Sequence, residues 1–182
     1  MDKTKKLEKI SKEIENCSEC KKNKVGKAVV GEGDPDADIV FIGEAPGRTE
    51  AETGRPFVGR SGKLLRKLIN EAGLKEKDVY ITSPVKYLPI YVTPTPQDIA
   101  HGKTHLDRQI KIIDPKIIVL LGNVAVQGVL SRKVQASKEH GRIIEEHSRK
   151  YFITVHPAAA LRFKKFKVLL EEDFKNLKKL LA

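Results

Sequence analysis

The stretch FIGEAPGRTEAETGRPFVGRSGKLL, residues 41–65, decides the fold, because it joins the end of a strand to the start of a helix. The apolar run at residues 38–43, DIVFIG, is typical of a strand buried on both faces. Residues 61–73, SGKLLRKLINEAG, have the spacing of an amphipathic helix that ends at a glycine. Glycines and prolines crowd the turn between them, together with the acid Glu44 and the ring of Phe57. Such a turn at a strand end predicts a ligand site.

The same alternation continues along the chain. Further apolar runs and helical patterns lie at VYITS (79–83), 96–113, KIIVLLG (116–122), 123–131 and YFITVHP (151–157). Strands that alternate with helices favour βαβ units and a parallel sheet covered on both faces. We therefore expect residues 1–182 to form a single domain, a three-layer α/β/α sandwich around a mostly parallel four-stranded sheet.

Two amphipathic helices are expected at the ends of the chain. Residues 3–17 predict a short helix that ends near Cys17, and residues 161–181 predict a long final helix. In the final helix one stripe is predicted to face the core: Phe163, Phe166, Leu170, Phe174 and Leu177.

The charge balance indicates the chemical class of the binding partner. Lys and Arg number 35 against 24 Asp and Glu, a formal net charge of +11, which favours a polyanion such as nucleic acid. The sequence has no apolar run of about 18 residues, and its first ten residues are too charged for a signal peptide. We expect a cytoplasmic monomer that does not enter a membrane.

Three segments with unusual residues follow apolar runs: GEAPG (43–47), SPVKY (83–87) and HPAAAL (156–161). In open α/β sheets, ligands bind beyond the carboxyl ends of the strands, so the three segments are predicted to form one site.

These segments, with GRPFVGRSGKLL, TPTP and KIIVLLG in the same order, resemble the uracil-DNA glycosylase superfamily. The similarity is to the family 4 enzymes, which carry an iron-sulfur cluster, and it runs from about Cys17 to the last helix. The resemblance implies an enzyme that turns a uracil out of the DNA stack and hydrolyses its N-glycosidic bond, leaving an abasic site. It implies no nucleotide cofactor.

The resemblance also implies roles for residues of the first turn. Phe57 would stack on the flipped base, a contact worth about 1 to 3 kcal/mol, with Gly43 and Ala45 beside it. Cleavage leaves positive charge on the sugar, so a carboxylate is needed nearby. Glu44 is the first candidate for this catalytic carboxylate and Glu50 the second.

The last segment matches a loop that contributes to catalysis and to DNA binding. His156 would stabilise the charge that develops on the uracil O2 atom, and it can do so as a neutral donor. Leu161 would enter the minor groove as a wedge, and Arg162, Lys164 and Lys165 would meet phosphates.

Ser83 stands where family 4 enzymes usually have an asparagine that reads the edge of uracil. A hydroxyl cannot make the two-point contact of an amide. Two alternatives to uracil cleavage therefore stay open: release of another deaminated base, hypoxanthine or xanthine, and a module that binds DNA without cutting it.

The positions of the iron-sulfur cluster ligands also differ from those of the family 4 enzymes. Cys17 and Cys20 form the C-x2-C pair of the family, but Tyr87 and Gly102 occupy the positions of the other two cysteines. We therefore expect no stable 4Fe-4S cluster. Two alternatives remain, a metal-free core or a remodelled metal site formed by Cys17, Cys20 and His101, with His105 close by.

Overall fold

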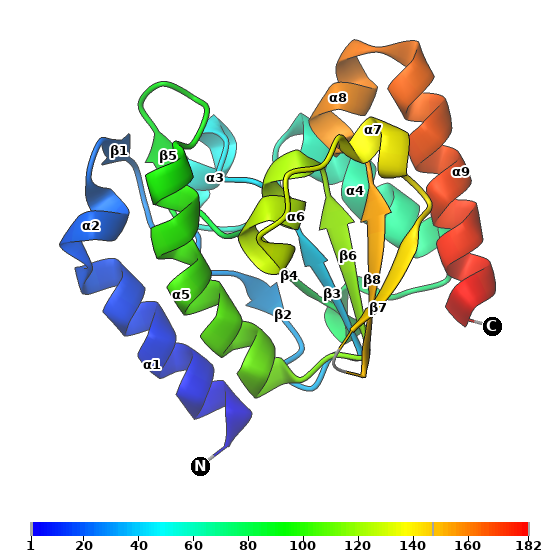
Figure 1. Ribbon diagram of the computed structural model, residues 1–182. Helices are drawn as coiled ribbons and strands as arrows, with labels where there is room; N and C mark the ends of the chain where they lie inside the picture. The colour runs from blue at the N-terminus through cyan, green and yellow to red at the C-terminus, as the bar shows by residue number, and fades with distance from the viewer. Residues whose placement is uncertain (1, 147, 182) are drawn as a thin grey trace.

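The computed structural model describes residues 2–146 and 148–181, and its centre is a six-stranded sheet (Figure 1). The strand order is β2 (Glu32–Gly33), β4 (Tyr80–Thr82), β3 (Ile39–Ile42), β6 (Ile117–Leu121), β8 (Arg149–Thr154), β7 (Ile143–Glu146). The middle four strands, β4, β3, β6 and β8, are parallel and are the four predicted from the apolar runs.

The predicted strand number was wrong, because an antiparallel strand is added at each edge of the sheet. β2 has only two residues, and its partner is β4. β7 pairs with β8, and its residues alternate between exposed and partly buried, which leaves Ile143 40% exposed. Neither strand has the continuous apolar run of a buried central strand.

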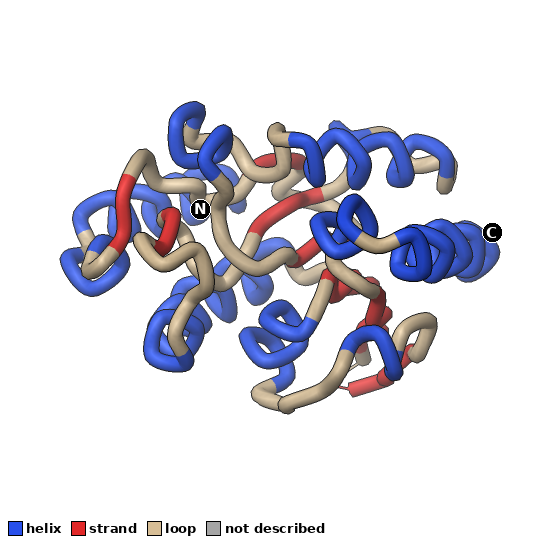
Figure 2. The backbone as a smooth tube through the Cα atoms, turned by 90° about the horizontal axis from the view of Figure 1, so that it is seen from above, coloured by secondary structure: helices blue, strands red, loops and turns tan. Residues whose placement is uncertain are grey.

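Helices cover both faces of the sheet (Figures 1 and 2). On one face lie α1 (Lys3–Asn16), α5 (Pro96–Ile113) and α6 (Asn123–Leu130); on the other lie α4 (Arg60–Glu71) and α9 (Lys164–Leu181). Alternate residues of one strand serve the two layers, since Ile118 packs with the first group of helices and Val119 with the second. The α/β class is therefore confirmed, with helices on both sides of a mixed, mostly parallel sheet.

Shorter elements connect these layers. They are α2 (Ser18–Lys21), β1 (Lys24–Val25), α3 (Arg48–Thr53), η1 (Glu76–Asp78), β5 (Leu88–Pro89), α7 (Ala136–Glu139) and α8 (Pro157–Arg162). β1 and β5 form a separate antiparallel pair beside α2 and α5. In the described residues, none of the helices combines the length and the apolar character needed to cross a membrane.

The final helical stretch differs from the single helix expected over residues 161–181. The chain is extended at Phe163, which separates α8 from α9, and the Phe163 side chain is 54% exposed. The prediction that Phe163 lies in the core was therefore wrong. Leu170, Phe174 and Leu177 are buried as predicted, and Phe166 packs at the edge of that core.

Candidate active site and a Cys-His cluster

A pocket of about 400 Å³ opens where the parallel strands end. Its walls come from the turn after β3, the turn after β4 and the start of α8. Seven of the residues selected from the sequence line it: Glu44, Ala45, Glu50, Phe57, Ser83, His156 and Arg162. The three segments that were predicted to meet therefore do meet.

Phe57 is held in an uncommon conformation at the pocket wall. Its φ is +51°, a left-handed value that bulky residues rarely adopt, and its side chain is only 9% exposed. Two glycines make room for it: a Cβ at Gly43 would lie 2.4 Å from Phe57 Cζ, and one at Gly62 would lie 2.0 Å from the Phe57 carbonyl carbon. Gly43 is thus required beside the aromatic ring, although it is not itself among the lining residues.

Arg66 of α4 fixes the loop that carries Phe57, and sequence reasoning missed it. Its Nε donates to Phe57 O at 2.8 Å, and its Nη2 donates to Pro56 O at 2.8 Å. The same guanidinium forms ion pairs of 2.6 Å with Glu32 and with Glu76. In the sequence this arginine looks like any solvated charge of an amphipathic helix, so nothing in the local pattern identifies it.

His156 presents a defined tautomer to the pocket. Its Nδ1 accepts a hydrogen bond from Ala158 N at 3.1 Å, so the ring proton of the neutral form is on Nε2. A Cβ at Gly43 would lie 3.7 Å from Nε2, which puts this nitrogen beside the turn after β3. The Phe57 ring lies 5.9 Å away between centroids, with 30° between the two planes. Burial lowers the pKa of His156 to about 4, so the ring is a neutral hydrogen-bond donor at pH 7.

The two candidate carboxylates differ in what they bind. Glu50 is buried, and its Oε1 accepts hydrogen bonds from Val58 N at 2.9 Å and Gly59 N at 2.7 Å. Its carboxylate therefore ties α3 to the start of α4. Glu44 lines the pocket, and burial raises the pKa of its carboxyl group. Of the two, Glu44 is better placed to act on a ligand.

Ser83 is 5% exposed and already donates its hydroxyl proton to Val85 O at 2.8 Å. Toward the pocket it therefore offers oxygen lone pairs, which can accept a hydrogen bond.

Apolar and basic side chains lie on the chain segment around the lining residues Arg162 and Phe163. Leu161 is 44% exposed, and Lys164 and Lys165 are exposed at the start of α9. Arg162 and Phe163 line the pocket itself. The loop before α5 also contributes to the wall through Val92 and Thr93, which the sequence did not identify.

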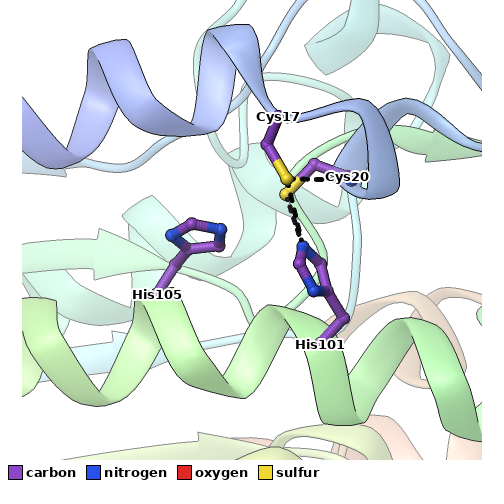
Figure 3. Close-up of side chains that lie close together, drawn as sticks. All are labelled: Cys17, Cys20, His101 and His105. Atoms are coloured by element: carbon purple, nitrogen blue, oxygen red, sulfur yellow. Dashed lines mark hydrogen bonds between the residues drawn. The ribbon is translucent and has the colours of Figure 1, made fainter.

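A second group of functional side chains, the Cys-His cluster, lies away from the pocket where the end of α1 meets α5 (Figure 3). It consists of Cys17, Cys20, His101 and His105, and one ligand atom of each lies within 4.8 Å of those of the others. Both sulfur atoms lie 3.3 Å from His101 Nε2. The cluster is a possible metal site. His105 was not in the predicted ligand set, although its spacing of four residues from His101 places both on one helix face.

Comparison with known proteins identifies the family. Residues 30–179 match the model of the uracil DNA glycosylase superfamily. The chain is 42% identical to the type-4 uracil-DNA glycosylase of Sulfurisphaera tokodaii over 185 residues, which cover 96% of this chain and 84% of that protein. It is 40% identical to the enzyme of the same type from Saccharolobus solfataricus over 187 residues, with 97% and 87% covered. The match to the Thermotoga maritima type-4 enzyme is 42% over 160 residues, with 86% and 83% covered.

The fold, the pocket and the superfamily match define the class of protein, a member of the uracil DNA glycosylase superfamily. Within that superfamily, the chain belongs to the type-4 uracil-DNA glycosylases.

Proposed function

We propose that this protein hydrolyses the N-glycosidic bond between uracil and deoxyribose in DNA and leaves an abasic site. The observation that carries the proposal is the meeting of Phe57, Glu44 and His156 around one pocket at the carboxyl end of the sheet. A volume of about 400 Å³ is in the usual range for sites that take small ligands. The type-4 relatives support uracil as the base that is released.

Each side chain of the pocket has a step to perform. The uracil leaves the stack and lies on the ring of Phe57. When the C1′–N1 bond breaks, its electron pair goes to the base, and His156 Nε2–H donates a hydrogen bond to O2 of the departing uracil anion. The sugar carries the matching positive charge, which the Glu44 carboxylate stabilises. Glu44 also orients the water that attacks C1′ and accepts its proton, for which a raised pKa is suited.

Other predicted residues hold the site or the DNA. Glu50 is a positioning residue, because its carboxylate is already bound to two amides of the Phe57 loop. Leu161 fills the place of the flipped nucleotide in the stack, and the cations of Arg162, Lys164 and Lys165 bind phosphates.

Ser83 reads the base as a hydrogen-bond acceptor. Its proton is committed to Val85 O, so its oxygen accepts the N3–H of uracil. This single contact replaces the two-point contact that an asparagine would give, and it predicts weaker discrimination among bases.

The family's 4Fe-4S cluster does not fit this chain. Two thiols remain, and the buried Tyr87 occupies the position where the resemblance implies a third. Iron-sulfur clusters are held by thiolates, and a phenol is a poor replacement. No step of the reaction passes through a metal. A single domain, a monomeric state and a cytoplasmic location stay predictions.

The test is base release under single-turnover conditions from oligonucleotides that contain uracil, hypoxanthine or xanthine. We expect release of uracil, and a loss of about 100- to 10,000-fold in rate for Glu44→Gln. Glu52→Gln, an exposed acid of the same segment, is the matched control and should keep the wild-type rate.

Three results would contradict parts of the proposal. Release of hypoxanthine or xanthine, while uracil stays attached to its oligonucleotide, would identify another substrate. DNA binding without release of any base would identify a non-cutting module. Equal rates for Glu44→Gln and Glu52→Gln would remove Glu44 from catalysis.

A further inference from the structure

We propose that the Cys-His cluster binds one zinc ion in tetrahedral coordination, and that this ion fastens the N-terminal helices to α5. The site is structural and separate from the pocket, so it goes beyond the proposed base release. Four observations support it: the ligand spacing, the donor chemistry, a buried histidine without partners and the place of the cluster in the fold.

The spacing of the ligand atoms fits a single ion. Zinc lies about 2.3 Å from sulfur and about 2.0 Å from imidazole nitrogen, so neighbouring vertices of a tetrahedron are about 3.3 to 3.8 Å apart. In the structure both sulfurs are 3.3 Å from His101 Nε2, and no pair among the four atoms exceeds 4.8 Å. This limit exceeds the longest tetrahedral edge by about 1 Å, and small side-chain rotations can close the difference.

The donor set also selects the metal. Two sulfurs and two imidazole nitrogens with tetrahedral spacing are typical of a closed structural zinc site. Oxygen ligands, which magnesium and calcium prefer, are not part of the cluster. A four-iron cluster needs a wider cage lined by thiolates, and the described chain supplies two of them.

The environment of the His105 ring is the feature that is hardest to explain without an ion. Both ring nitrogens are buried, and among the described residues neither has a hydrogen-bond partner. A buried polar group without a partner is costly, so such groups are rare in folded proteins. A metal ion at the centre of the cluster gives one of these nitrogens its partner.

The local backbone is arranged to hold the ligands. Cys17 lies between α1 and α2, and its sulfur accepts a hydrogen bond from Cys20 N at 3.4 Å. His101 and His105 are one helical turn apart on α5, and their ring centroids are 5.4 Å apart. The ion therefore joins two segments that are about 80 residues apart in the chain, as the Cys20–His101 separation of 81 shows. α5 begins directly after the loop that lines the pocket through Val92 and Thr93.

The first experiment measures metal content. The full chain is purified under reducing conditions in medium that supplies both zinc and iron, and metals and acid-labile sulfide are quantified. We expect one zinc per chain and no sulfide. Replacement of zinc by Co²⁺ should give the visible absorption of tetrahedral cobalt together with a sulfur-to-cobalt charge-transfer band. Removal of the ion by a chelator should lower Tm by roughly 10 °C, and added zinc should restore it.

Variants assign the ligands. Cys17→Ser and His105→Ala should each lower zinc affinity by more than about 100-fold, since even outer partners of a metal site are worth 10- to 100-fold. His105→Cys should keep one zinc, because a thiolate also binds it, and this variant keeps the test valid if His105→Ala does not fold. The control is His140→Asn: this histidine is bound to Asp173 on the α9 side of the sheet, and the variant should keep one zinc.

Stoichiometric iron with sulfide, or a folded protein that takes up no metal from zinc- or cobalt-containing buffer, would overturn the proposal. Uracil release is measured on the same samples. An active protein without metal would contradict only the zinc site, whereas a zinc-loaded protein that releases no base would contradict only the proposed function.

Discussion

His156 and Glu44 reach the same pocket in complementary protonation states. The His156 Nδ1 lone pair is engaged by Ala158 N, and burial keeps the ring neutral, so the only proton it can offer is on Nε2. Burial also raises the pKa of Glu44, which makes it a better proton acceptor than a solvated glutamate. In the proposed mechanism His156 therefore stabilises the leaving base and Glu44 activates the water.

This assignment predicts the pH dependence of cleavage. Below the raised pKa of Glu44 its carboxyl group is protonated, so the single-turnover rate should rise with pH through that pKa. Above it the rate should be level through neutral pH, because His156, with a pKa of about 4, stays neutral throughout. In Glu44→Gln the remaining rate should not change with pH over this range. An acidic limb that persists in Glu44→Gln with the same midpoint would assign the titration to another group.

The same substitution separates catalysis from folding. A carboxyl group whose pKa is raised in the folded state destabilises the protein at pH values above its unfolded pKa. Glu44→Gln removes that buried charge, so its free energy of unfolding at pH 7 should not fall while its rate does. Denaturant unfolding of both proteins at pH 7 checks this.

At the scale of elements, the loop between α3 and α4 is held by two side chains, one from each helix. Glu50 binds the amides of Val58 and Gly59, and Arg66 binds the carbonyl groups of Pro56 and Phe57. These contacts offset the cost of the left-handed backbone at Phe57.

Arg66→Ala should therefore reduce the rate of base release as well as the stability. Loss of the guanidinium leaves the carbonyl groups of Pro56 and Phe57 without their donor and removes the ion pairs with Glu32 and Glu76. A displacement of the Phe57 ring by about 1 Å can cost roughly 100-fold in rate. Lys67→Ala on the same helix is the control. The Lys67 side chain is 69% exposed and pairs with Glu71, and exposed ion pairs of this kind contribute under about 1 kcal/mol to stability. Single-turnover rates and DNA affinity are measured for both. A full rate in a destabilised Arg66→Ala protein would limit Arg66 to a structural role.

Local pattern predicted the central elements well. The four apolar runs gave the parallel strands, and α5 begins and ends where its sequence indicates, with Thr95 and Asp98 forming a capping box at its start. The three segments that converge on the pocket were also recognisable, because each follows a strand.

The features that the local sequence pattern did not predict depend on tertiary contacts. β2 and β7 are strands because a neighbour offers hydrogen bonds at each edge, and neither segment is a continuous apolar run. Arg66 gains its role from a loop that folds back over α4, and His105 gains its role from cysteines more than 80 residues away. No short window of sequence contains both His105 and the cysteines; Phe57 lies only nine residues before Arg66, but no pattern in that window indicates that the two are in contact.

At the scale of the whole molecule, the net charge of +11 favours a DNA partner in general, and the basic residues near the pocket suggest where it binds. Arg162 lines the pocket, and Lys164 and Lys165 follow at the start of α9. Each phosphate contact releases counterions, so it makes affinity depend on salt.

A substitution that removes one phosphate contact should reduce the slope of log affinity against log salt by about 0.9. The variants to test are Arg162→Gln, Lys164→Gln and Lys165→Gln. Lys77→Gln is the control, because Lys77 lies in η1 before β4, at the opposite end of the sheet from the pocket. Binding to uracil-containing duplex is measured over a series of salt concentrations. Equal slopes for the pocket-side variants and Lys77→Gln would place the DNA elsewhere.

A crystal structure of Glu44→Gln bound to a uracil-containing oligonucleotide tests directly whether the base enters this pocket. We predict that the uracil is turned out of the duplex and lies on the Phe57 ring, with its O2 within hydrogen-bond distance of His156 Nε2. A uracil that remains stacked in the duplex, or that binds away from this pocket, would contradict the account.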